Sequence, residues 1–169
     1  MGTKFYVTKH GYSRLLQKID DLENRLKRTQ SSVGEAADIG GNQWHDNSSY
    51  EQLVIDIRGQ NKRLIDAHSV QNNCIVVEPH SNIEKAVIGT MLEILVNDVD
   101  KEKWGIVGYD ESDLERNFIA YNTPLAKLLC GMKKDEEKIG SIAGRKVKVK
   151  IISIEIITDK HYQTREGEP

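Results

Sequence analysis

The first half of the chain contains two stretches in which apolar residues recur every three or four positions. These stretches span residues 12–37 and 50–71, and both form a narrow apolar stripe. A narrow stripe is typical of a coiled-coil seam, whereas a helix that covers a globular core has a wider apolar face. Thr29 and Gln60 interrupt the seam with polar side chains, which often fix the register of paired helices. The pattern predicts two long helices that fold back as an antiparallel hairpin.

A polar loop, GGNQWHDNSSY at residues 40–50, separates the two stretches. Ser48 and Glu51 match a capping box, with Ser48 as the N-cap, and so mark the start of the second helix. Helices of roughly 26 residues are about 40 Å long, so we expect the loop at an exposed far end. A loop that only reverses the chain does not need a tryptophan, and Trp44 therefore makes this end a candidate functional site.

The second half of the chain has the alternating apolar and polar pattern of β-strands. The predicted strands are AVIGTMLEILV, KWGIVG, NFIAY and VKVKIISIEII, at residues 86–96, 103–108, 117–121 and 147–157. A short helix is expected at residues 124–131, because proline starts it and glycine ends it. We therefore predict an α+β protein, with an N-terminal coiled-coil hairpin followed by an antiparallel sheet that carries one helix. The expected domains are residues 1–76, with the hairpin tip at 38–49, and residues 82–158, followed by a polar tail at 159–169.

The composition predicts a cytoplasmic protein that neither crosses a membrane nor is exported. The 169 residues are 38% hydrophobic and 30% charged, with a formal net charge of -2. No apolar run approaches the roughly 18 to 20 residues of a membrane helix, and the N-terminus lacks the apolar core of a signal peptide. The two cysteines are far apart and form no CxxC pair, which argues against a disulfide framework or a structural zinc site. The near-neutral charge argues against a dedicated binder of duplex DNA.

Four short motifs, in this order along the chain, are similar to those of one known family. They are YVTKHGYSRL at residues 6–15, DNSSY at 46–50, IVGYDESD at 106–113 and YNTPLAKLLCG at 121–131. With the hairpin pattern, they resemble the bacterial Gre transcript-cleavage factors, and the resemblance covers about residues 4–157. The motifs and their order are more specific than the hairpin pattern alone.

The resemblance implies both a fold and a function. It implies an FKBP-like C-terminal domain that docks at the rim of the secondary channel of bacterial RNA polymerase. The hairpin would pass down the channel to the active site and the 3′ end of the nascent RNA. There its acidic tip would hold Mg²⁺ jointly with the polymerase, activating water to cleave the transcript. Such a factor is not an enzyme by itself, has no cofactor of its own and is expected to be monomeric.

The hairpin loop departs from the family pattern at one acid. The cleavage-competent loop is commonly G-D-L-x-E-N-x-x-Y, with acids three positions apart. Aligned on Tyr50, Asp46 takes the place of the second acid and is the candidate Mg²⁺ ligand, but Gln43 stands where the first acid is expected. Asp38 is a candidate second acid, since Mg²⁺ binding relies on carboxylates and retained waters. Asp46 also has a simpler interpretation as a residue that stabilises the helix dipole by about 0.3–1 kcal/mol.

Other candidate residues follow from the resemblance, and each has a simpler interpretation beside it. Trp44 either staples the helix ends together or inserts into the polymerase as an aromatic anchor. His45 is either a solvated loop residue or a polymerase contact that transfers a proton or touches metal. RNA contacts are implied for basic residues that otherwise form a solvated face: Arg25, Arg28, Arg58 and Lys62. Polymerase contacts are implied for five residues of the second domain: Asp110, Glu111, Asp113, Thr123 and Pro124. The three acidic residues have a simpler interpretation as ordinary turn residues.

Two other functions remain open. Gln43 in place of an acid suggests a regulator that occupies the same channel and inhibits or modulates the polymerase without cleaving RNA. An FKBP-type prolyl isomerase with a helical appendage is a third hypothesis, and it requires an aromatic-lined pocket. The second half offers Trp104, Tyr109, Phe118, Tyr121 and Tyr162 as the aromatic residues for such a pocket.

Overall fold

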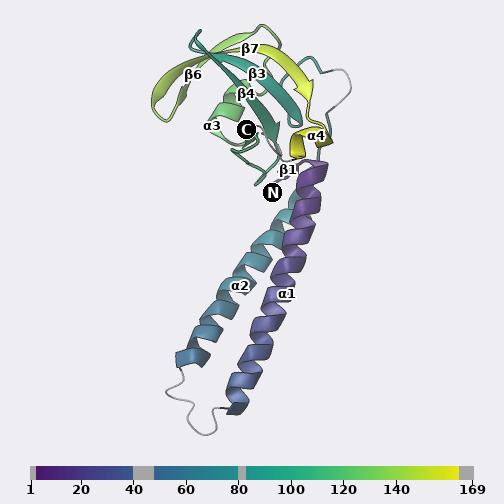
Figure 1. Ribbon diagram of the computed structural model, residues 1–169, viewed down its shortest axis with the longest axis vertical. Coiled ribbons are helices and arrows are strands. Elements are labelled where there is room, and N and C mark those ends of the chain that lie inside the picture. The colour runs from purple at the N-terminus through teal and green to yellow at the C-terminus, as the bar shows by residue number, and fades with distance from the viewer. Residues whose placement is uncertain (1–2, 40–47, 80–82, 164–169) are drawn as a thin grey trace, which may run out of the picture. The chain divides into compact units, whose positions relative to one another are not determined.

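A computed structural model describes residues 3–39, 48–79 and 83–163 of the chain (Figure 1). The chain divides into two compact units. One contains Tyr12–Cys74 and the other contains Lys4–Gly11 together with Ile75–Pro169. Within the described residues, no helix is long and apolar enough to cross a membrane.

The first unit consists of two long helices, α1 (Lys9–Ile39) and α2 (Ser48–Asn73), which run side by side (Figure 1). Gln60 contacts Thr29, and further along α2 His68 contacts Glu23, which precedes Thr29 in α1. The two helices are therefore antiparallel, as the apolar spacing predicts. Their most buried apolar residues, Ile19 and Ala67, belong to the predicted seam.

The second unit is built on a curled five-stranded sheet in the order β5-β4-β3-β7-β6. The strands are β3 (Thr90–Val96), β4 (Asp100–Val107), β5 (Phe118–Ala120), β6 (Glu137–Ile142) and β7 (Arg145–Ile156). The expectation of a purely antiparallel sheet is wrong, because β4 and β5 pair in parallel. Residues 108–117 carry the chain back before β5 begins, and this reversal allows the parallel pairing. The overall α+β class is as predicted.

Strand β6 was missed from the sequence for a physical reason. Its sequence, EKIGSI, is polar at most positions, so it lacks the alternation that marks a half-buried strand. It lies at the edge of the sheet and pairs only with β7, from Glu137↔Lys150 to Ile142↔Arg145. Polar side chains are common on edge strands, because one side of such a strand faces solvent.

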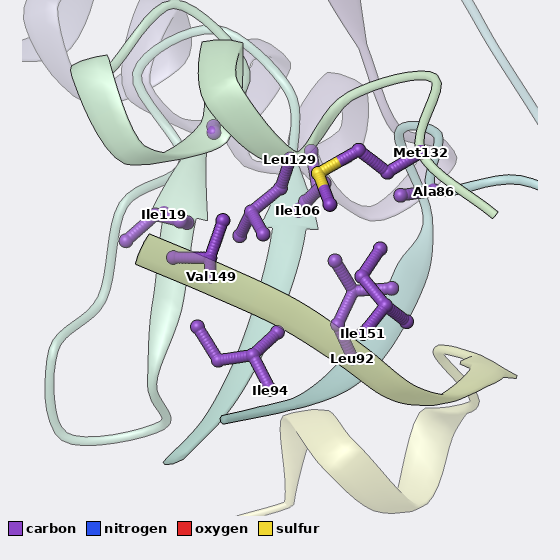
Figure 2. Packing of buried hydrophobic residues seen from close by; sticks show 10 residues of the cluster. Ala86, Leu92, Ile94, Ile106, Ile119, Leu129, Met132, Val149 and Ile151 are labelled. Carbon is purple, nitrogen blue, oxygen red and sulfur yellow. The ribbon is translucent and has the colours of Figure 1, made fainter. Parts of the chain in front are cut away.

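The hydrophobic core of this unit lies between the sheet and the helix α3 (Pro124–Leu129), as Figure 2 shows. Strands β3 and β7 contribute alternating inward residues, including Leu92, Ile94, Val149 and Ile151, which are fully buried. Leu129 of α3 is also fully buried against them. The predicted short helix is therefore confirmed, and it closes the core over one face of the sheet.

Residues 4–11 belong with the second unit, whereas the expected first domain, residues 1–76, includes them. Strand β1 (Phe5–Val7) pairs with β2 (Cys74–Val76), and the Tyr109 amide donates to the Tyr6 carbonyl at 2.8 Å. Three residues are too few to show a sequence period. The sequence therefore does not reveal the pairing of β1 with β2, which places the N-terminal segment in the second unit.

The first residues of the expected polar tail at 159–169 are helical. Residues Asp159–Tyr162 form a short helix, α4. The Tyr162 ring stacks on His10, with centroids 4.0 Å apart, and meets Phe118 edge-on at 5.2 Å. Aromatic pairs of this kind add to the area that the rings bury. The contacts of one tyrosine thus hold in place a segment whose neighbours are polar.

Candidate functional site

The predicted working end of the hairpin lies at the junction of its two helices. Helix α1 ends at Ile39 and α2 begins at Ser48, so residues 40–47 join the C-terminal end of α1 to the N-terminal end of α2. The candidate tip residues lie in that connection, outside the described residues: Gln43, Trp44, His45 and Asp46. Asp38 lies in the last turn of α1, but its side chain is likewise outside the description. The structure thus describes the helices that carry the tip.

The start of α2 carries an acidic residue that stabilises the helix. Glu51 lies in the first turn of this helix, where a carboxylate interacts favourably with the helix dipole. The prediction that α2 starts at Ser48 agrees with the observed boundary. The side-chain hydrogen bonds of the expected capping box fall outside the described residues.

The four basic residues predicted to contact RNA are all exposed on the two helices: Arg25, Arg28, Arg58 and Lys62. The register set by Gln60 and Thr29 places Lys62 level with Lys27, next to Arg28, on the neighbouring helix. Exposed cations on a rod-like surface can contact phosphates without sequence preference. They are also compatible with an ordinary solvated face.

Glu111 has an internal role, which differs from the exposed position expected for a partner contact. Its side chain is only 5% exposed. One carboxylate oxygen accepts a hydrogen bond from the Thr8 amide at 2.8 Å, and the other accepts from the Thr8 hydroxyl at 2.6 Å. Hydrogen bonds to a carboxylate are stronger than those between neutral groups. We therefore assign Glu111 to the anchoring of the N-terminal segment.

Two glycines leave the space that this carboxylate occupies. A Cβ on Gly11 would lie 1.9 Å from Glu111 Oε1, and one on Gly108 would lie 2.1 Å from the same atom. The Gly11 amide also donates to the Thr8 hydroxyl at 3.0 Å, which caps the start of α1. Two motifs that are about a hundred residues apart in the sequence thus form one structure, which we call the Thr8–Glu111 anchor.

Asp113 organises the turn that follows. Its carboxylate accepts hydrogen bonds from the backbone amides of Glu115 and Arg116 and from the Arg116 guanidinium. Desolvation by burial on its own raises the pKa of this carboxyl, but the hydrogen bonds and the charge of Arg116 outweigh it. The pKa of Asp113 is therefore lowered. Asp110, in the same turn, has a positive φ of 59°, a conformation that aspartate tolerates better than most residues.

Thr123 and Pro124 start helix α3. The Thr123 hydroxyl donates to the Ala120 carbonyl at 2.8 Å and accepts from the Ala126 amide at 3.4 Å, while Pro124 occupies the first turn. Both residues are common at helix starts for these reasons. Their predicted contact with a polymerase stays a prediction beside this local role.

No group of three or more histidine, cysteine, aspartate or glutamate residues in the described part of the chain could hold a metal ion. The candidate Mg²⁺ ligand Asp46 lies outside that part. A single carboxylate fits a shared Mg²⁺ site, since Mg²⁺ is commonly bound by one or two carboxylates with water and substrate oxygens completing its shell.

The anchor residues Thr8, Gly11 and Gly108 were not singled out as functional from the sequence. Each lies in a motif that was recognised, but the motif does not show that its residues contact those of another. A buried glutamate between two glycines becomes apparent only when the two segments meet. Spacing within either motif carries no signal of that contact.

Comparison with known proteins agrees with the motifs. Residues 79–156 match the family described as transcription elongation factor, GreA/GreB, C-term. The chain is 27% identical over 145 residues to transcription elongation factor GreA of Nautilia profundicola, covering 83% of this chain and 88% of the relative. It is 26% identical over 155 residues to GreA of Lachnoclostridium phytofermentans, covering 90% and 96%.

Among solved structures, the GreA factor homolog 1 (Gfh1) protein of Thermus thermophilus is similar, with a TM-score of 0.42 and 18% identity. The match covers 90% of this chain and 99% of that one, but a score at this level does not establish a shared fold. The sequence matches are more informative about the relatives of this chain. The GreA proteins align with most of its length, and its C-terminal part also matches the GreA/GreB family. Residues 79–156 thus match the C-terminal family of the GreA/GreB transcription elongation factors, and most of the chain is similar to GreA proteins at 26–27% identity.

Proposed function

We propose that this protein binds bacterial RNA polymerase in its secondary channel and stimulates cleavage of backtracked nascent RNA. The observation that carries the proposal is the pair of antiparallel helices joined by residues 40–47. With 31 and 26 residues, the helices are long enough to reach about 40 Å into a narrow passage. The similarity to transcription elongation factors supports the polymerase as the partner.

In this proposal each part of the chain has a separate task. The second unit, as an FKBP-like domain, docks at the channel rim, and the helices act as a coiled coil that carries Asp46 inward. The exposed cations Arg28 and Lys62, one on each helix, contact phosphates of the RNA backbone. The protein acts as a cytoplasmic monomer and contributes no catalytic centre of its own.

Asp46 supplies a carboxylate to a metal site that the polymerase otherwise provides. Mg²⁺ bound there would stabilise the leaving oxygen and lower the pKa of an attacking water. Trp44 and His45 flank Asp46 in the sequence and would contact the channel wall. Because Gln43 offers only a neutral oxygen, Asp46 and Asp38 are the carboxylates available for this role.

The test uses backtracked elongation complexes of a bacterial RNA polymerase with labelled RNA and Mg²⁺. The protein at saturating concentration should release 3′ fragments faster than the polymerase alone, and Asp46→Asn should abolish the gain without loss of binding. Asp56→Asn is the matched control, because Asp56 is an exposed acid on α2 that pairs only with the nearby Gln52 in the described contacts. Absence of stimulated cleavage by the unaltered protein would refute the proposal.

The second candidate, a regulator that does not cleave RNA, rests on Gln43. It predicts that the unaltered protein binds the polymerase and slows synthesis without releasing fragments. Gln43→Asp would then restore the acid spacing of the family loop and create cleavage. Fragment release by the unaltered protein would rule this candidate out.

A further inference from the structure

A hydrogen bond between two half-buried side chains crosses the seam between α1 and α2. The Gln60 amide nitrogen donates to the Thr29 hydroxyl at 3.0 Å, and both side chains are half-buried. The Thr29 hydroxyl in turn donates to the Arg25 carbonyl of its own helix at 3.1 Å. The remaining Gln60 oxygen is buried and accepts no hydrogen bond from the described residues.

This arrangement is unfavourable for stability alone. A buried polar atom without a partner loses its hydration and recovers nothing, whereas an apolar side chain of similar size would fill the same place favourably. Neighbouring seam positions are occupied by Leu26 and Leu64, which are partly buried. A leucine at position 60 would continue the seam, so stability does not account for the glutamine.

The connection between the helices does not by itself select one register. Residues 40–47 form a connection at the long end of those that join packed helices, so its length permits more than one alignment. Because seam residues recur every three or four positions, sliding one helix by a heptad would bring apolar positions opposite each other again. Such a slide moves α2 by about 10 Å along its axis.

The polar contact distinguishes the two alignments. After a slide of one heptad towards the C-terminal end of α1, Thr29 would face Ala67, which is buried in the seam, and Gln60 would lose its partner. The second contact between the helices joins His68 and Glu23 at 3.4 Å, but both side chains are substantially exposed, at 41% and 53%. Exposed pairs contribute little. The pairing of β1 with β2 also opposes the slide where α1 begins and α2 ends, and the buried contact opposes it within the helices.

We propose that Thr29 and Gln60 are positioning residues that hold α1 and α2 in one register at some cost in stability. The register decides which residues of the two helices flank the connection at 40–47. Its effect on cleavage rests on the proposed function, because the register would set how far Asp46 is presented beyond the helices. The register itself does not depend on that function.

The test compares the full chain with its Gln60→Leu variant, which leaves the Thr29 hydroxyl bonded to its own helix. Nitroxides are attached to ketone-bearing amino acids at the exposed positions Lys27 and Arg63, so that both native cysteines remain. Pulsed electron paramagnetic resonance then measures the distance between the labels. We expect one population in the unaltered protein, and in Gln60→Leu a second population displaced by about 10 Å along the helix axis.

The matched control is Gln52→Leu. Gln52 is exposed on the same helix and contacts only Asp56 among the described residues. It should leave the distance unchanged. Gln60→Leu should also raise the unfolding temperature while lowering the maximal cleavage rate per bound factor, a combination that a merely structural role would not produce.

A single distance in Gln60→Leu, equal to that of the unaltered protein, would overturn the inference whatever the stability of the variant. If the unaltered protein stimulates no cleavage, the proposed function fails while the distances still decide the register. A second population without a change in cleavage would show that the register is set here but does not govern the tip, which overturns the link to function.

Discussion

Substitution of Glu111 by glutamine tests the Thr8–Glu111 anchor. Glutamine has nearly the same shape as glutamate but has one acceptor oxygen, and its amide group donates hydrogen bonds. The Thr8 amide and hydroxyl both donate to this side chain, at 2.8 and 2.6 Å. In Glu111→Gln, one of these donors must face an NH₂ group inside a site that is only 5% exposed.

The magnitude follows from the contact that is lost. Leaving a buried donor without a partner costs about 1–3 kcal/mol, and bonds to a charged acceptor lie at the upper end. For a chain of this size each kcal/mol lowers the unfolding temperature by roughly 2–4 °C. We therefore expect Glu111→Gln to unfold some 3–10 °C below the unaltered protein, since the loss lies in the unit that contains β1 and the start of α1.

Thermal unfolding followed by circular dichroism and calorimetry measures this shift. Hydrogen exchange should show faster exchange at the amides of Thr8 and Gly11, which the anchor protects. Thr8→Ser is the matched control, because serine keeps the hydroxyl and the backbone amide that donate to Glu111. An unfolding temperature for Glu111→Gln within about 1 °C of the unaltered protein would refute the anchoring role.

Three further predictions concern stability. Gly34→Ala and Gly59→Ala should each stabilise the helices by up to about 1 kcal/mol, because a Cβ at either position meets nothing within 4 Å; chemical denaturation checks this, and a loss of stability would contradict it. Asp113→Asn should destabilise at neutral pH. Because the folded pKa of Asp113 is lowered, its contribution is present above the ordinary value of 3.8 and is lost as the pH falls through the folded pKa. The difference from the unaltered protein in urea titrations should therefore shrink with acid, and a difference that grows would contradict the argument. Leu129→Ala should cost about 2–5 kcal/mol, since the side chain is fully buried beneath the sheet, and a midpoint unchanged in urea would show that the site is not tightly packed.

The long helices could be predicted because their signal is local. Apolar spacing of three and four identified both, and it also identified Thr29 and Gln60 as the polar breaks in the seam. That these two residues contact each other required the register, which no periodicity specifies. The tip residues were located in the same way, at residues 40–47, and their roles stay predictions.

The sheet was predicted less completely, because strand pairing depends on residues far apart in the chain. The alternation of β7 identified its strand, but edge strand β6 is too polar to show a period. The parallel pairing of β4 with β5 follows from the path of residues 108–117, and sequence patterns do not specify that path. The contacts of Tyr162 with His10 and Phe118 likewise join three distant segments.

By itself the sequence determined the helices, most strands and the resemblance to a known family, since periodicity and short motifs are properties of neighbouring residues. The tertiary structure alone decided what Glu111 does. An acid in a turn looks exposed in the sequence, but here the turn brings its carboxylate to the Thr8 amide and hydroxyl, with glycines on both sides leaving room. Burial of a charged group is stable only where donors from elsewhere in the chain meet it, and that meeting is decided by the fold.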